Sequence, residues 1–309
     1  MTDVETGVRH IEANGIDIAF ETFGDPSGSP VLLVMGLGTQ MLAWPEDFCE
    51  ALAARGHYVI RFDNRDSGLS THLYSVRAPN PVSVYLGRAK PPYTLDDCAK
   101  DTLGLMDALG LPSVHLVGIS MGGFVAQTVA VAHPERLRSL TLMMTSTGNR
   151  LVGYAKPKMI LNILRRRTVR TRDEAMDAAV ETFRSIGSPG YDVDEERIRE
   201  VAARAFDRAH DPGGYLRQLS AIMAQPDRTA KLRQLAVPTL VIHGRADPLV
   251  NWTGGRALAK AIPGAKLHVF PGMGHDMPRA LWPRFAEEIG DLAERGDGQL
   301  PARSGFVSG

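Results

Sequence analysis

Apolar residues form five continuous runs along the chain, each with the length of a β-strand that is buried on both faces. They are Val31–Met35, His57–Phe62, Ser113–Val117, Leu137–Met143 and Thr239–His243. Lys266–Phe270 is a shorter, more mixed run of the same kind. Two runs nearer the N-terminus, HIEA and IDIAFETFG, flank Asn14-Gly15, a pair that favours the positive φ angles of a tight hairpin turn.

Stretches with helical periodicity lie between these predicted strands. They are Glu46–Arg55, Leu95–Leu109, Met121–Ala132, Trp252–Ala261 and Arg279–Glu294. Thr94 is a suitable N-cap for the second of them, with acidic residues in its first turn. The alternation of strand and helix predicts an α/β fold with a mostly parallel, eight-stranded sheet and helices on both faces.

The alternation stops between residues 147 and 225, a stretch rich in arginine and helix formers without a buried-strand run. We interpret residues 147–225 as a helical cap inserted between two strands, and we call them the cap segment. The core then comprises residues 1–146 and 226–295. Residues 296–309 are rich in glycine, serine and proline, which is typical of a disordered tail.

Charge and cysteine content exclude some partners and suggest a compartment. The 309 residues carry 35 Lys and Arg against 35 Asp and Glu, so no general attraction to nucleic acid is expected. Cys49 and Cys98 have no metal-type spacing and are expected as two buried thiols in a reducing compartment. The polar N-terminus resembles no signal peptide, and glycines and polar residues interrupt the longest apolar stretch, Pro30–Trp44. We therefore expect a cytoplasmic protein.

A candidate nucleophile lies where the third apolar run meets the helix that follows it, in the sequence Gly118-Ile119-Ser120-Met121-Gly122. A serine on such a strand-to-helix turn is held in a strained backbone conformation with its hydroxyl above the sheet, and its flanking glycines avoid a clash. The pattern fixes few residues and could arise by chance, but here it falls between a strand and a helix, as the nucleophile elbow requires. The Met121 amide, at the helix N-terminus, is then a candidate oxyanion donor.

The serine needs a base and an acid. In α/β folds with a nucleophile elbow, these residues follow it along the chain in the order Ser, acid, His. Asp247 comes after one buried strand and His275 after the last strand, which predicts a triad of Ser120, Asp247 and His275. His57, His115, His243 and His268 lie in or beside strands and His133 ends a helix, so these look structural. Asp276 and Asp227 are rival acids, although neither follows a strand as Asp247 does.

Two loops near the predicted triad are expected to support it. The loop Met35-Gly36-Leu37-Gly38-Thr39-Gln40 would supply a second oxyanion donor, the Leu37 amide, although an ordinary glycine-rich turn would look the same. We interpret the segment RFDNRDSGLS, with Asp63, Arg65, Asp66 and Ser70, as a hydrogen-bonded loop behind the site.

These motifs resemble the α/β-hydrolase superfamily from about Ile16 to Ile289, outside the cap segment. The run LLVMGLGTQMLAWPEDFCEALAARGHYVIRFDNRDSGLST, with VGISMGG, LVIHGRADP and FPGMGH, is similar to the aclacinomycin methylesterase group of actinobacterial esterases. That resemblance implies a carboxylic ester hydrolase without cofactor or metal. Many superfamily members begin the oxyanion loop with His-Gly; Met35-Gly36 is a variant that this group shares.

The expected activity is hydrolysis of carboxylic esters, including lipid esters or thioesters, through an acyl-enzyme. A ligand receptor on a hydrolase fold is the non-enzymatic alternative, and serine-type perhydrolases and C–C hydrolases are close in sequence. Ser120 argues against dehalogenases and epoxide hydrolases, which need a carboxylate nucleophile, and neither glycine-rich loop has P-loop or dinucleotide-binding spacing. We expect a small-molecule ester with an apolar acyl group as substrate and no nucleic-acid partner.

The basic arm, residues 150–172 of the cap segment, mixes eight Lys and Arg residues with apolar ones. It begins at Arg150, and the other cations are Lys156, Lys158, Arg165, Arg166, Arg167, Arg170 and Arg172. An amphipathic helix of this kind can lie on an anionic membrane, which would suit lipid substrates. The alternative is a solvated cap face whose apolar side covers the site.

Overall fold

The sheet has eight strands in the order β1-β2-β4-β3-β5-β6-β7-β8. The computed structural model describes residues 7–156, 159 and 169–298. The strands are β1 (Arg9–Ala13), β2 (Ile16–Phe23), β3 (Ser29–Val34), β4 (His57–Phe62), β5 (Val114–Ile119), β6 (Leu137–Met143), β7 (Thr239–Gly244) and β8 (Lys266–Phe270). β1 and β2 pair antiparallel and β2 joins β4 antiparallel, whereas the pairs from β4 to β8 are parallel. The predicted mostly parallel eight-stranded sheet is confirmed.

The first two strands form the predicted hairpin. Asn14 and Gly15 both have positive φ, 52° and 74°, so the turn pair adopts the left-handed backbone that its residue types favour. The register pairs Ala13 with Ile16 across this turn.

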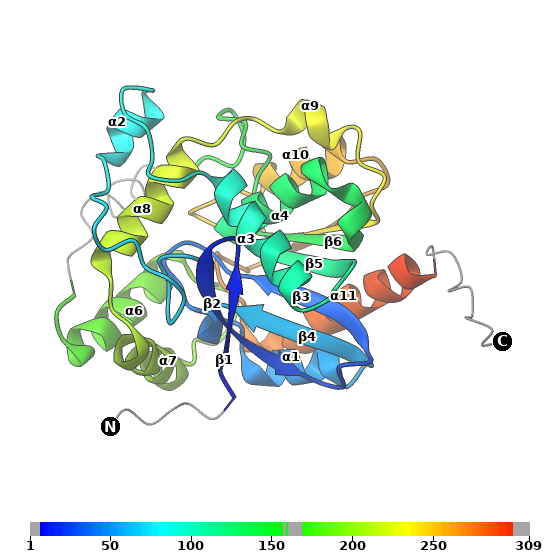
Figure 1. Cartoon of the computed structure of the whole chain (residues 1–309), viewed down its shortest axis with the longest axis horizontal. Helices are drawn as coiled ribbons and strands as arrows, with labels where there is room; N and C mark the ends of the chain where they lie inside the picture. Colours follow the sequence, from blue (N-terminus) through cyan, green and yellow to red (C-terminus); the bar gives the residue numbers. More distant parts are fainter. Residues whose placement is uncertain (1–6, 157–158, 160–168, 299–309) are drawn as a thin grey trace.

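Helices cover both faces of the sheet (Figure 1). Alternate residues of one strand belong to two separate hydrophobic cores. Leu32 and Val34 of β3 pack toward α3 (Leu95–Ala108), α4 (Met121–Ala132) and α10 (Thr253–Ala261). Val31 and Leu33 pack toward α1 (Glu46–Ala53) and α11 (Trp282–Asp297). This layering explains why β3 is apolar from Pro30 to Val34, as a strand buried on both faces must be.

Helices of the cap segment lie between β6 and β7 in the chain. They are α6 (Arg172–Ile186), α7 (Glu195–Arg208) and α8 (Pro212–Met223), and α9 (Thr229–Leu232) follows them. α6, α7 and α8 gather on one side of the sheet, whereas α9 lies beside α10 (Figure 1). α8 lies next to the short helix α2 (Pro81–Tyr85), which the hydrophobic pattern did not predict. A capping box at Thr171 and Glu174 begins α6, and the Asp194 and Asp211 side chains accept backbone amides at the starts of α7 and α8.

The predicted tail begins too early. Helix α11 continues to Asp297, because the Asp297 carboxylate accepts hydrogen bonds from Ser29 (2.6 Å) and Arg138 (3.0 Å) and so fixes the last turn to the sheet. Residues 299–309 lie outside the described residues, as do residues 157–158 and 160–168 of the basic arm, which include Lys158 and residues 165–167. The prediction of membrane contact through that arm therefore stays a prediction.

Two further expectations concern cysteines and membrane spans. Cys49 and Cys98 are both buried, free thiols, as predicted. Among the described helices, none combines the length and the apolar character needed to cross a bilayer.

Candidate active site

Ser120 lies at the sharp turn between β5 and α4. Its φ of 53° and ψ of −113° are strained for a residue with a side chain. The turn is held by two hydrogen bonds, from the Ser120 amide to the Met143 carbonyl (2.9 Å) and from Thr145 Oγ1 to the Ser120 carbonyl (2.9 Å). A Cβ added at Gly118 would lie 2.6 Å from the Gly122 carbonyl carbon, and one added at Gly122 would lie 2.6 Å from the Val34 carbonyl carbon, so neither glycine has room for a side chain.

The three residues predicted as a triad lie in one hydrogen-bonded chain. Ser120 Oγ lies 3.1 Å from His275 Nε2, and His275 Nδ1 lies 2.7 Å from Asp247 Oδ2. Asp247 follows β7 and His275 follows β8, so the carboxyl ends of three strands bring the residues together. With Nδ1–H donated to the carboxylate, Nε2 is the nitrogen that faces the serine hydroxyl, which is the arrangement of a general base.

The Asp247 carboxylate is completely buried and fully hydrogen-bonded. Its other oxygen accepts the backbone amides of Leu249 and Val250, both at 2.8 Å. Burial alone would raise the pKa of Asp247. The facing His275 and the hydrogen bonds from His275 and His243 outweigh burial and hold that pKa well below its usual range. The carboxylate therefore stays ionised and can stabilise an imidazolium at His275.

The loop after β3 lies against the nucleophile. A Cβ at Gly36 would be 3.3 Å from Ser120 Cβ, so this loop passes within van der Waals distance of the elbow. Thr39 Oγ1 donates to the Gly36 carbonyl at 2.9 Å, and Gln218 of α8 accepts the Gly38 amide at 2.7 Å. Leu37 lies between these two anchored glycines. Its amide and that of Met121, the first residue of α4, are the two predicted oxyanion donors.

The loop after β4 supports the oxyanion loop from behind, in agreement with its predicted role. The fully buried Asp63 carboxylate accepts the Met41 amide at 2.7 Å, and Asn64 Nδ2 donates to the Met35 carbonyl at 3.1 Å. Ser70 Oγ donates to the Asp63 carbonyl at 2.6 Å. Both ends of the oxyanion loop are thus fixed by side chains of one neighbouring segment.

Arg65 and Asp66 of the same segment form buried ion pairs. Arg65 contacts Asp101 of α3 with two nitrogens, at 2.5 and 2.6 Å. Asp66 receives two hydrogen bonds from Arg217 of α8, at 2.7 and 2.9 Å, and so ties the cap segment to the core.

Neither rival acid takes the place of Asp247. Asp227 accepts from Asn149 and Thr229, in a turn. Asp276 is next to His275 in the chain, but its carboxylate accepts the hydroxyl of Ser188 from the cap segment. His243, interpreted above as structural, lies 3.5 Å from Asp247 Oδ2 and contacts the Val250 carbonyl at 2.8 Å, beside the acid that it helps to hold.

Sequence reasoning missed several residues that hold the site, namely Thr145, Ser188 and Gln218. Thr145 lies two positions after a strand end, a place that could have drawn attention to it. Ser188 and Gln218 belong to the cap segment and reach the site through long-range contacts, for which the sequence offers no local signal.

One group of possible metal ligands occurs in the described part of the chain, Asp66, His72 and Asp211. Arg217 donates to both carboxylates of this group, at 2.7 Å to Asp66 and 2.5 Å to Asp211. The guanidinium already neutralises the charge that a metal ion would require, so the group is a structural ion network.

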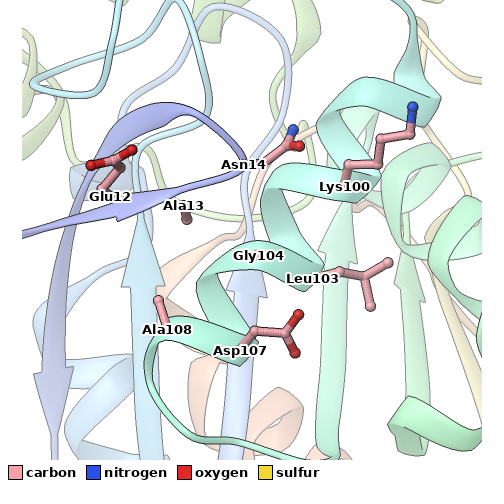
Figure 2. A pocket seen from close by; sticks show the side chains of 8 residues that line it. All are labelled: Glu12, Ala13, Asn14, Lys100, Leu103, Gly104, Asp107 and Ala108. Carbon is pink, nitrogen blue, oxygen red and sulfur yellow. The ribbon is translucent and has the colours of Figure 1, made fainter.

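A surface groove of about 500 Å³ lies apart from these residues, between β1 and α3 (Figure 2). Figure 2 shows Glu12 on the strand and Lys100 and Asp107 on the helix around it. It contains none of the residues discussed for the site.

Residues 29–278 match the family model of the alpha/beta hydrolase fold, and the chain belongs to this family. Within it, the chain is similar to rhodomycin D methylesterase DauP of Streptomyces sp. (strain C5). The two are 31% identical over 303 residues, which cover 91% of this chain and 96% of the relative. Rhodomycin D methylesterase DnrP of Streptomyces peucetius is 29% identical with the same coverage. The resemblance to a methylesterase group is confirmed.

Solved structures agree with the fold. The enol-lactonase from Burkholderia xenovorans LB400 superposes with a TM-score of 0.73 at 24% identity, covering 93% of this chain and 100% of the other. A thermophilic esterase from Thermogutta terrifontis gives a TM-score of 0.68 at 25% identity, covering 93% and 99%.

Proposed function

We propose that this protein is a serine-dependent carboxylic ester hydrolase with Ser120 as nucleophile, His275 as general base and Asp247 as the orienting acid. The hydrogen-bonded chain from Ser120 Oγ through His275 to a buried, ionised Asp247 is the observation that carries the proposal. The similarity to two methylesterases supports ester hydrolysis as its chemistry.

In the first half-reaction, Ser120 Oγ attacks the ester carbonyl carbon while its proton passes to His275 Nε2. The negative charge that forms on the carbonyl oxygen is stabilised by the amides of Met121 and Leu37. His275 then gives its proton to the departing alcohol, and the C–O bond breaks to leave an acyl group on Ser120. Throughout, the imidazolium is stabilised by the Asp247 carboxylate.

In the second half-reaction, water attacks the acyl-enzyme. His275 takes a proton from the water, the same two amides hold the second oxyanion, and the carboxylic acid is released as the proton returns to Ser120 Oγ. No cofactor takes part in either half.

We further propose that the cap segment, residues 147–225, covers this site and selects the ester. Its helix α8 lies against the oxyanion loop, since a Cβ at Gly38 would be 2.5 Å from the Tyr215 ring. An aromatic side chain beside the oxyanion loop suits an apolar acyl group. Hydrolysis of a methyl ester, as the names of the two relatives state for them, is one specific reaction within this class.

The test is hydrolysis of p-nitrophenyl esters from acetate to palmitate by wild type, Ser120→Ala and the control Ser27→Ala, a serine in an exposed turn. We expect Ser120→Ala to lower kcat by at least about a thousandfold and Ser27→Ala to leave it unchanged. The chain-length optimum would measure the space under the cap segment. If wild type and Ser120→Ala are equally inert on every ester, and neither is labelled by a fluorophosphonate, the proposal is wrong. A ligand receptor on this fold would then be the better description.

C–C bond hydrolysis is the second candidate. The chain is 31% identical over 177 residues to 2-hydroxy-6-oxononadienedioate/2-hydroxy-6-oxononatrienedioate hydrolase 2 of Pseudomonas putida, which covers 56% of this chain. Turnover of a vinylogous 1,5-diketone acid without turnover of any ester would favour it.

A further inference from the structure

A turn of the cap segment, residues 186–190, lies directly on the loop that carries His275. Three backbone amides cross between them. The His275 amide donates to the Ile186 carbonyl at 2.7 Å, the Gly190 amide donates to the Gly272 carbonyl at 3.0 Å, and the Gly274 amide donates to the Ser188 hydroxyl at 2.8 Å. The backbone amides of Gly274 and His275 are therefore both held by the cap segment.

The two backbones approach so closely that side chains are excluded between them. A Cβ at Gly274 would lie 2.5 Å from the Ile186 carbonyl oxygen, and one at Gly190 would lie 2.8 Å from Gly272 Cα. An approach of this kind leaves no room for the His275 loop to shift toward the cap segment.

Ser188 is the side chain at the centre of this contact. It is 3% exposed, and its hydroxyl accepts the Gly274 amide while it donates to the Asp276 carboxylate. One hydroxyl thus holds the chain on both sides of the histidine, at positions 274 and 276. Burial raises the pKa of Asp276, which agrees with a carboxyl that has few other partners.

The core fixes a different part of the loop. The Ala246 amide donates to the Met273 carbonyl at 2.9 Å, and the Arg245 amide donates to the Phe270 carbonyl at 3.0 Å. Phe270 and Met273 are therefore attached to the segment that follows β7, whereas Gly272 and residues 274–276 are attached to the cap segment.

We propose that Ser188, acting with Asp276, is a positioning residue that aligns His275 with Ser120. It does so by holding residues 186–190 of the cap segment against the loop that carries His275. This role rests on the proposed function. Neither side chain takes part in bond making; they hold the backbone from which the imidazole extends. Misplacement of a catalytic group by about 1 Å can cost about a hundredfold in rate, so a modest shift of residues 274–276 would be measurable.

The experiment compares Ser188→Ala, Asp276→Ala, Asp276→Asn and the double variant Ser188→Ala/Asp276→Ala with wild type. Ser185→Ala is the matched control, because Ser185 lies three residues earlier at the end of α6 and its hydroxyl donates within its own helix, to Thr182 at 2.9 Å. For each protein, kcat and KM on one p-nitrophenyl ester, the second-order rate of labelling by a fluorophosphonate, and the thermal midpoint are measured. Labelling reports the reactivity of Ser120 without reference to any natural substrate.

We expect Ser188→Ala and Asp276→Ala to lower kcat and the labelling rate about tenfold to a hundredfold while KM stays nearly unchanged. Asp276→Asn should restore most of the rate, since the amide oxygen still accepts the serine hydroxyl. The double variant should lose no more than the worse single variant, because both remove one contact. Should Ser188→Ala fail to fold, Asp276→Ala against Asp276→Asn gives the same comparison.

Unchanged kcat and labelling in Ser188→Ala and Asp276→Ala, beside an active wild type, would overturn the positioning role and leave the proposed function intact. Equal losses in Ser185→Ala would also overturn it, since they would show a general effect on the cap segment. A wild type that neither hydrolyses esters nor reacts with the fluorophosphonate would instead overturn the proposed function itself.

Discussion

At Gly122, the addition of a single methyl group should lower both the stability and the activity of the protein. Gly122 lies in the first turn of α4, against the end of β3, where an added Cβ would be 2.6 Å from the Val34 carbonyl carbon and 2.8 Å from the Met35 carbonyl oxygen. Both neighbours are backbone atoms of a buried strand and of the oxyanion loop that follows it, so neither can rotate away as a flexible side chain would.

The size of the effect follows from these distances. Ordinary van der Waals contact begins at 3.4 Å, and the Val34 carbonyl oxygen lies nearer to the added Cβ than its carbon does. Gly122→Ala therefore requires α4 and β3 to separate by at least about 0.8 Å at this point. Overpacking of this kind costs about 1–3 kcal/mol of stability. The same separation moves the Met121 amide away from the Leu37 amide, and a displacement near 1 Å in a catalytic constellation can cost about a hundredfold in kcat.

The assay is urea unfolding together with kcat on a short-chain p-nitrophenyl ester. Gly298→Ala is the control, because the nearest atom to its added Cβ is 3.5 Å away. We expect Gly122→Ala to unfold at lower urea and to lose far more activity than its residual folded fraction explains. If its unfolding midpoint and kcat both match those of Gly298→Ala, the elbow and the oxyanion loop are not packed as closely as these distances indicate.

Three further variants test other parts of the structure. Gln218→Leu leaves the Gly38 amide without its acceptor and should lower kcat about tenfold with little change in KM, measured by steady-state kinetics. Arg217→Met leaves the buried Asp66 carboxylate without its guanidinium and should lower the free energy of unfolding by about 3–5 kcal/mol, measured by chemical denaturation. Burial lowers the pKa of His115 to about 4, from 6.5 in the unfolded chain, so the unfolded state binds the proton first as pH falls. Wild type should therefore lose up to about 3 kcal/mol between pH 6.5 and 4, and His115→Asn should lose less, in denaturation series over that range.

Each of these variants has an outcome that contradicts the reasoning. A Gln218→Leu enzyme that changes KM alone would place this side chain in substrate binding rather than in support of the loop. An Arg217→Met protein as stable as wild type would mean that Asp66 is not left charged and buried. Parallel stability curves for wild type and His115→Asn from pH 6.5 to 4 would show that His115 is not the group whose protonation opposes folding.

The sheet could be predicted from the sequence because a strand that is buried on both faces is a continuous run of apolar residues. The ranges 57–62, 137–143 and 266–270 match β4, β6 and β8 at both ends, and 121–132 matches α4. Residues that disfavour a strand mark two of these ends, Gly56 before β4 and Pro271 after β8. The end of α11 could not be predicted, since it depends on contacts of Asp297 with Ser29 and Arg138, which are distant in sequence.

The bounds of the cap segment could be predicted from the sequence, but the contacts that its residues make with the site could not. Its composition indicates helix, yet the contacts of Ser188 with residues 274 and 276, and of Gln218 with residue 38, pair positions 86 to 180 residues apart. Serine and glutamine are common on helix surfaces, and nothing local separates these two from their neighbours. The meeting of Ser120, Asp247 and His275 was easier to predict, because all three lie at strand ends, where the chain order of the fold indicates which residues meet.

The attachment of the cap segment to both the oxyanion loop and the histidine loop has a consequence for protein engineering. Exchange of whole caps between relatives, a common route to new substrate ranges, would here also exchange two supports of the catalytic centre. A chimera would keep its turnover if the donor cap supplied a hydroxyl at position 188 and an amide at position 218. Excision of the cap should produce a slow enzyme rather than a permissive one.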